Sequence, residues 1–149
     1  FPTRRSSDLD YIRSVAPGFI FTTSLPPIVA AAAAASIRHL KVSGQERAMQ
    51  QRQAARLKAA FAEAGLPVMP SESHIVPLLV GDPAKARDFS NRLLYDHNIY
   101  VTAINYPTVD KGTERLRFTP TPRHTDAMIE ELMDILVPMF NEAGIRKSA

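Results

Sequence analysis

Apolar residues recur at helical spacing in four segments of the chain, and each segment has its own start signal. The first segment follows Pro26-Pro27 and continues through six consecutive alanines to about Leu40. Proline is tolerated in a first helical turn, and alanine is the best helix former. The second segment follows Ser43-Gly-Gln-Glu46, a spacing typical of a capping box, and runs to about Ala64, where Gly65 is expected to end it. Its predicted apolar face comprises Met49, Leu57, Phe61 and Ala64.

Two further helices are predicted in the second half of the chain. Asp82 followed by Pro83 is typical of an N-cap and a first helical position, so a helix is expected to about Asp96. The side chains that it would turn toward the core are Phe89, Leu93 and Leu94. Thr125 is expected to cap the last helix. The apolar stripe of that helix is Met128, Ile129, Leu132, Ile135, Leu136 and Met139.

Three short segments between these helices have the character of strands. The segment from His74 to Val80 contains Pro77, which favours a sheet edge or a bulge because proline cannot donate to a ladder. A second strand is predicted from Ile99 to Ile104, and a third from Arg115 to Thr119. The pattern predicts an α+β fold in which a small, mostly antiparallel sheet is covered by helices.

The amino-acid composition argues against several classes of function. The chain has 149 residues, 45% of them hydrophobic, which is enough for a domain with its own core. Cysteine is absent, so disulfides and thiolate ligands are excluded. The four histidines are scattered without metal-ligand spacing, and we interpret them as structural. The formal charge of +3 is not concentrated on one face, so nucleic-acid binding is not indicated.

An uncharged stretch from Val15 to Ile37 raises the question of a membrane span. Prolines interrupt it, and the run after Pro27 has ten residues, Ile28 to Ile37. A spanning helix needs about 20. We therefore predict no membrane segment, and a cytoplasmic location, because no targeting signal is visible. The first nine residues, Phe1 to Leu9, resemble the translation of a sequencing-adapter oligonucleotide and are interpreted as a non-native leader.

The most informative stretch for chemistry is INYPTV at Ile104 to Val109 followed by GTERLRFTPTPRH at Gly112 to His124. Strand periodicity places Arg115 and Arg117 on one face and Leu116 and Phe118 on the other. An arginine held on a strand can form a bidentate pair with a carboxylate. Spacing alone makes the two arginines equal candidates, and it equally allows both to be solvated.

This stretch, together with APGFIFTTSLPP at Ala16 to Pro27 and SHIVP at Ser73 to Pro77, resembles the 5-aminolevulinate synthases. That family belongs to the α-oxoamine synthases of the fold-type I pyridoxal-phosphate class. The resemblance extends from Asp10 to about Phe140 and implies a C-terminal fragment. Residues 10–40 would then be the end of the large domain and an inter-domain helix, and residues 41–149 the C-terminal small domain.

The resemblance also implies an activity and a set of site residues. The family condenses glycine with succinyl-CoA to 5-aminolevulinate, CoA and carbon dioxide in haem biosynthesis, as a homodimer with pyridoxal 5'-phosphate. Arg117 matches the arginine that binds the glycine carboxylate, and Thr108 matches a threonine of the acyl-CoA site. Thr22, and less closely Ser24, match hydroxyls that reach the cofactor phosphate of the neighbouring subunit. Both could instead cap the helix that follows Pro26.

The family's Schiff-base lysine precedes the APGF stretch, so no catalytic residue is expected in this chain, and the fragment alone is expected to be inactive. Two alternatives remain at this stage. One is another α-oxoamine synthase, of the amino-ketobutyrate or biotin-pathway type. The other is a non-catalytic α+β binding module that uses Arg115 and Arg117 to hold an acidic ligand.

Overall fold

The computed structural model describes residues 6–145, and the chain divides into two compact units, Phe1–Ser43 and Gly44–Ala149. The predicted leader lies partly outside the described residues, because the first five are not described. The leader and the assignment of the two units to a large and a small domain stay predictions.

The described part of the first unit is helical. Its elements are α1 (Ser6–Val15), α2 (Pro17–Ile20) and α3 (Pro27–Val42). The predicted alanine-rich helix is confirmed, with Pro26 as its N-cap and Pro27 in its first turn. None of the residues of these three helices is buried.

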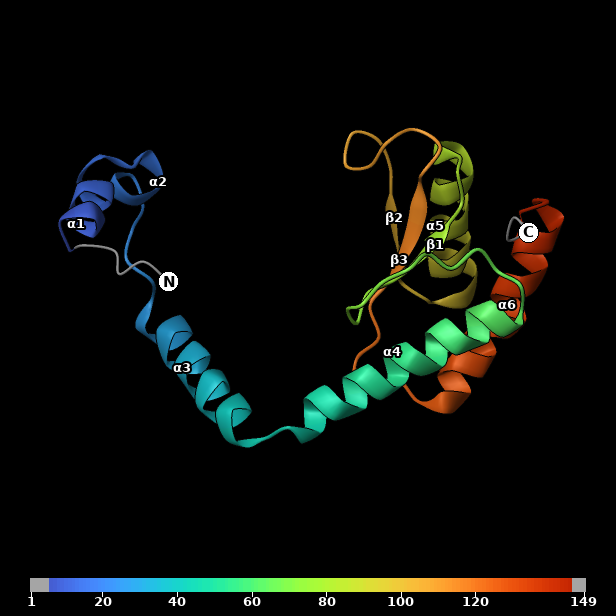
Figure 1. The fold of residues 1–149 in the computed structure, drawn as a ribbon, viewed down its shortest axis with the longest axis horizontal. Coiled ribbons are helices and arrows are strands. Elements are labelled where there is room, and N and C mark those ends of the chain that lie inside the picture. Colours follow the sequence, from blue (N-terminus) through green and yellow to red (C-terminus); the bar gives the residue numbers. More distant parts are fainter. Residues whose placement is uncertain (1–5, 146–149) are drawn as a thin grey trace. The chain divides into compact units, whose positions relative to one another are not determined.

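The second unit combines three helices with a sheet, which confirms the predicted α+β class (Figure 1). Its helices are α4 (Gln45–Glu63), α5 (Pro83–His97) and α6 (Asp126–Glu142), and its strands are β1 (Val76–Leu79), β2 (Thr102–Ile104) and β3 (Arg115–Phe118). The strand order is β1-β3-β2, and both pairings are antiparallel. The central strand is therefore the one that carries the two arginines.

Pro77 lies in an edge strand, as its lack of an N–H predicts. The Pro77 carbonyl accepts a hydrogen bond from the Met69 amide at 2.9 Å, and the Leu79 amide donates to the Pro67 carbonyl at 3.0 Å. At these two residues the backbone polar groups thus face away from β3. The missing N–H of Pro77 consequently costs the β1–β3 ladder no hydrogen bond.

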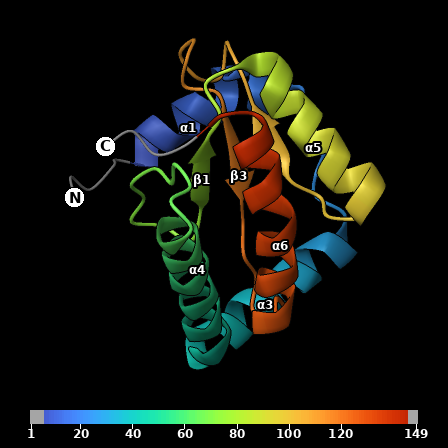
Figure 2. The same cartoon turned by 90° about the vertical axis from the view of Figure 1, so that its right-hand side faces the viewer.

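One face of the sheet forms the core with the three helices, which lie on a single side of it (Figures 1 and 2). Leu116 of β3 is fully buried, and the Phe118 ring meets the Phe61 ring of α4 edge-on with centroids 5.1 Å apart. Phe89 of α5 and Phe140 of α6 form a second aromatic pair, with centroids 5.0 Å apart. The opposite face of the sheet is covered by no helix of this unit.

Local signals correctly predicted most helix ends. The Asp82 carboxylate accepts hydrogen bonds from the Ala84 and Lys85 amides at 2.9 and 2.8 Å, which caps α5. The Thr125 hydroxyl accepts from the Met128 amide at 3.3 Å, which caps α6. Gly65 follows α4 with a φ of 69°, the left-handed conformation that favours glycine after a helix.

Other details were predicted wrongly. The N-cap of α4 is Gly44 and not Ser43, because Ser43 serves as the C-cap of α3. Met49 and Met128, both predicted on apolar faces, are 42% and 52% exposed (the helices that carry them are seen in Figure 2). Ala64 is exposed as the C-cap of α4. The strands are also shorter than predicted: β1 starts at Val76 and β2 at Thr102.

Candidate functional site

Arg117 lies on the sheet face opposite the core. It pairs in register with Pro77 of β1 and Thr102 of β2, so these three residues lie side by side on that face. Arg117 is exposed, whereas its neighbours Leu116 and Phe118 are buried. No hydrogen bond or ion pair joins its guanidinium to another residue in the described part of the chain. The group is therefore available to an outside carboxylate while its backbone is held in the central strand.

Arg115 shares this face but is used differently. Its Nε donates to the Thr113 carbonyl at 2.8 Å, and a terminal nitrogen donates to the Thr113 hydroxyl at 3.0 Å. The side chain is partly buried and folded back on Thr113, two residues before the start of its strand. Spacing made the two arginines equal candidates, and this local contact distinguishes them: Arg115 has internal partners, and Arg117 has none among the described residues.

Thr108 lies in the connection between β2 and β3, and its side chain is exposed. Its amide donates to the Asn105 carbonyl at 3.0 Å, which forms a turn around the cis peptide bond between Tyr106 and Pro107. The Lys111 ammonium lies 5.2 Å from the centroid of the Tyr106 ring. The loop thus presents the Thr108 hydroxyl on the same β2–β3 hairpin that carries Arg117.

Thr22 and Ser24 lie in the first unit, in the linker between α2 and α3, and both are exposed. The Thr22 amide donates to the Phe19 carbonyl at 3.3 Å. Neither side chain caps α3, because Pro26 is the N-cap and no side chain bonds to it. The alternative prediction that these hydroxyls cap the helix is therefore wrong. Exposed hydroxyls of this kind are suitable donors to a phosphate oxygen.

Two of the described lysines donate to backbone carbonyls. The Lys58 ammonium donates to the Ser71 and Ser73 carbonyls at 2.6 and 2.8 Å, and the Lys85 ammonium donates to the Ala143 carbonyl at 3.2 Å. Lys147 lies outside the described residues. Across residues 6–145 there is also no group of acidic or histidine side chains that could hold a metal ion.

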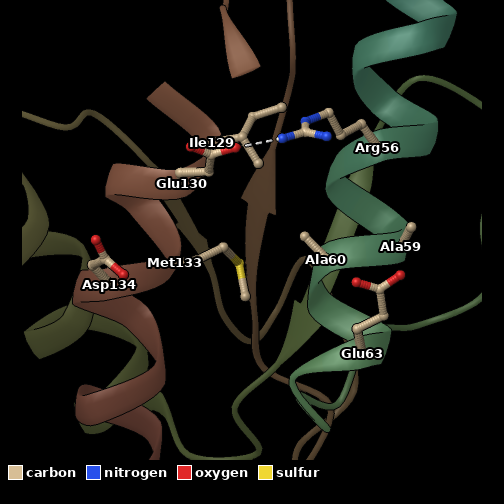
Figure 3. Close-up of a pocket in the computed structure, with 8 residues that line it drawn as sticks. All are labelled: Arg56, Ala59, Ala60, Glu63, Ile129, Glu130, Met133 and Asp134. Atoms are coloured by element: carbon tan, nitrogen blue, oxygen red, sulfur yellow. Dashed lines mark hydrogen bonds and ion pairs between the residues drawn. The ribbon is translucent and has the colours of Figure 1, made fainter. Parts of the chain in front are cut away.

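Figure 3 shows a groove between α4 and α6 that none of the predicted site residues lines. At its rim the Arg56 guanidinium binds the Glu130 carboxylate at 2.7 Å and the Asp126 carboxylate at 3.2 Å. Arg52 adds a second ion pair to Asp126, also at 3.2 Å. These side chains are substantially exposed, so each pair contributes about 0–1 kcal/mol. We interpret the cluster as a link between the two helices.

His124 has a structural role that matches its prediction. Its Nδ1 accepts a hydrogen bond from the Thr121 amide at 2.8 Å, which closes the turn that leads into α6. Because Nδ1 is an acceptor, the neutral ring carries its proton on Nε2. Within the described residues, no helix is long and apolar enough to cross a membrane.

Comparison with known proteins identifies the class. The chain belongs to the aminotransferase class I and II family, whose model matches residues 5–136. Among curated proteins it is 53% identical over 141 residues to a 5-aminolevulinate synthase of Rickettsia typhi, which covers 95% of this chain and 34% of that protein. It is likewise 53% identical over 137 residues to the 5-aminolevulinate synthase of Bradyrhizobium diazoefficiens, covering 92% of this chain and 34% of that protein. The predicted resemblance is thereby confirmed, and the chain spans about a third of the length of these relatives.

Solved structures give the same fold. The serine palmitoyltransferase of Sphingomonas wittichii superposes with a TM-score of 0.77 at 28% identity, over 92% of this chain and 35% of that one. An 8-amino-7-oxononanoate synthase from Francisella tularensis superposes with a TM-score of 0.75 at 22% identity, over 95% of this chain and 41% of that one. A further serine palmitoyltransferase structure superposes with a TM-score of 0.80 at 28% identity, over 92% of this chain and 35% of that one. That structure contains the pyridoxal-phosphate internal aldimine.

Proposed function

We propose that the chain is the C-terminal portion of a pyridoxal-phosphate-dependent 5-aminolevulinate synthase, which condenses glycine with succinyl-CoA. The single observation that carries the proposal is identity of about half over 95% of the chain to proteins of that name. The structural neighbours named for other acyl transfers match at only 22–28%. Close sequence agreement over the whole chain favours the same reaction over a sister reaction.

In this proposal Arg117 binds the glycine carboxylate. The planar guanidinium offers parallel N–H donors, which match the two oxygens of a carboxylate and fix its orientation. The ladder on both sides of β3 holds the backbone of Arg117 in place, and its exposed side chain has no competing partner among the described residues. The residue can thus orient the substrate without first breaking an internal bond.

Thr108 contributes a hydroxyl to the acyl-CoA site. A hydroxyl can donate to a carboxylate or carbonyl oxygen of the acyl group and can accept a bond in return. The β2–β3 loop presents it on the hairpin that also carries the glycine-binding arginine, so both substrates would be held by one structural element. We expect this arrangement to restrain the two reacting carbons relative to each other.

The cofactor would be held only in part by this chain. Thr22 and Ser24 would donate to the cofactor phosphate of the neighbouring subunit in a homodimer, and their exposure in the α2–α3 linker is consistent with that use. When bound, pyridoxal phosphate supplies an electron sink for the α-carbon of glycine. The lysine that carries the cofactor would come from the part of the enzyme that precedes these residues. A cytoplasmic location remains part of the proposal.

The test restores the missing part of the enzyme. In a chimera, this chain replaces the matching 137 residues of the Bradyrhizobium synthase. We expect the chimera to form 5-aminolevulinate from glycine and succinyl-CoA, and the 149-residue chain alone to form none. Acetyl-CoA and pimeloyl-CoA, and serine in place of glycine, test the sister reactions. A chimera that folds and binds pyridoxal phosphate but prefers another substrate pair would refute the proposed reaction.

Sequencing the source DNA upstream of the Asp10 codon provides an independent test. A reading frame that continues upstream into a glycine-rich segment with a lysine would support a longer synthase. Native codons for Phe1 to Leu9 that follow directly on a start codon would contradict it.

A further inference from the structure

The loop that carries Thr108 has two stems, and both form hydrogen bonds with the segment that joins β1 to the start of α5. At the first stem the Asn105 side-chain amide donates to the Pro83 carbonyl at 3.2 Å. At the second stem the Glu114 carbonyl accepts from the amides of Val80 and Gly81 at 2.8 and 2.9 Å. The turn between β1 and α5 and the first residue of α5 therefore anchor the two ends of the β2–β3 loop.

Glu114 is unusual because its acidic side chain is almost completely buried. It is 1% exposed, and it continues the alternation that buries Leu116 and Phe118. A buried charge is costly unless hydrogen bonds or an opposite charge compensate it. None of the ion pairs found within residues 6–145 involves Glu114. An apolar side chain would fill this position at a lower cost in free energy, so the presence of a carboxylate here requires another explanation.

The carboxylate binds the loop itself. Glu114 Oε2 accepts a hydrogen bond from the Gly112 amide at 2.9 Å. Gly112 has a φ of 82°, a conformation that suits glycine, and it lies four residues after Thr108. A Cβ on Gly81 would come within 3.5 Å of the Gly112 carbonyl oxygen, so the loop also rests directly against the anchoring turn. The buried carboxylate thus holds the distal half of the loop by its backbone.

We propose that Glu114 is a positioning residue for acyl-CoA binding: through the Gly112 amide it holds the loop in the conformation that presents Thr108. This inference rests on the proposed function, in which Thr108 contacts the acyl group. Arg117 should depend less on Glu114, because hydrogen bonds to β1 and β2 hold its strand. Loss of the carboxylate should therefore weaken the binding of succinyl-CoA more than the binding of glycine.

The experiment compares Glu114→Ala with Glu114→Gln in the Bradyrhizobium chimera. Glutamine keeps an acceptor oxygen in the same place, whereas alanine removes it. We expect Glu114→Ala to raise the KM for succinyl-CoA about tenfold, with the KM for glycine changed less than about twofold, because one charge-assisted hydrogen bond is lost. Glu114→Gln should restore the KM for succinyl-CoA to within about threefold of the unmodified chimera. Glu63→Ala, an exposed acid at the end of α4, is the matched control and should change neither KM.

Amide hydrogen exchange, measured on the same variants, reports directly on how firmly the loop is held. The Gly112 amide should exchange faster in Glu114→Ala than in Glu114→Gln, whereas the Val80 and Gly81 amides, which bond to the Glu114 backbone, should keep their protection. Equal changes in both KM values, or a glutamine variant as impaired as the alanine variant, would overturn the proposal. An unmodified chimera that is inactive would count against the proposed function. Hydrogen exchange at Gly112 would then test separately whether the Glu114 carboxylate holds the loop. Equal exchange rates of the Gly112 amide in Glu114→Ala and in the unmodified chimera would refute that hold.

Discussion

Under the proposed function, replacement of Arg117 should separate substrate binding from stability, because its guanidinium is exposed and has no partner among the described residues. A bidentate pair with the glycine carboxylate comprises two charge-assisted hydrogen bonds, each contributing about 1.5–3 kcal/mol. Arg117→Ala should therefore cost at least about 3 kcal/mol of glycine binding, which corresponds to a fall in kcat/KM for glycine of about 150-fold. Arg117→Lys keeps the charge but not the paired donors, so about half of this free energy should be lost.

Arg115 provides the control on the same strand face. Arg115→Ala removes two hydrogen bonds to Thr113 and should lower the free energy of unfolding by about 1–2 kcal/mol. It should change kcat/KM for glycine less than about threefold. Arg117→Ala should change the free energy of unfolding by less than about 0.5 kcal/mol.

The assay measures the glycine dependence of the chimera at saturating succinyl-CoA, and the unfolding of residues 44–149 in urea. The opposite pattern, in which Arg115→Ala abolishes glycine dependence and Arg117→Ala leaves it intact, would refute the assignment of the carboxylate to Arg117. Loss of stability in Arg117→Ala would show that this arginine has a structural partner.

Three further predictions concern folding and association. Phe61→Ala should destabilise residues 44–149 by about 3–5 kcal/mol in urea unfolding, since the ring is fully buried against Phe118; a loss below about 1 kcal/mol would contradict the packing. Asp82→Ala should cost about 1–2 kcal/mol in the same assay because it removes the cap of α5, while Asp82→Asn should retain most of the stability. The 149-residue chain should self-associate in light scattering, because large apolar side chains of its first unit such as Phe21 and Ile28 are 84% and 78% exposed; a clean monomer would refute this.

Local chemistry accounts for what could be predicted about the fold. A helix cap or a proline at a helix start acts within a few residues, so Asp82, Thr125 and Pro27 could be interpreted without knowledge of distant contacts. Alternation along β3 likewise predicted which residues are buried, since side chains on a strand point to opposite faces in turn. Local rules were least reliable where two elements meet. Ser43 fits a capping motif, yet it ends α3 and leaves Gly44 to begin α4.

By itself, the sequence determined the α+β class, the positions of the described helices after Pro26 and the two arginines on one strand face. Tertiary structure decided how the two arginines differ, because only in the folded chain does Arg115 bend back to Thr113 while Arg117 remains free within the described residues. It also revealed that the Glu114 side chain is buried and that its backbone carbonyl binds the Val80 and Gly81 amides, more than thirty residues away in sequence. No local pattern encodes such contacts, because they arise only when the antiparallel register brings the start of β3 beside the end of β1.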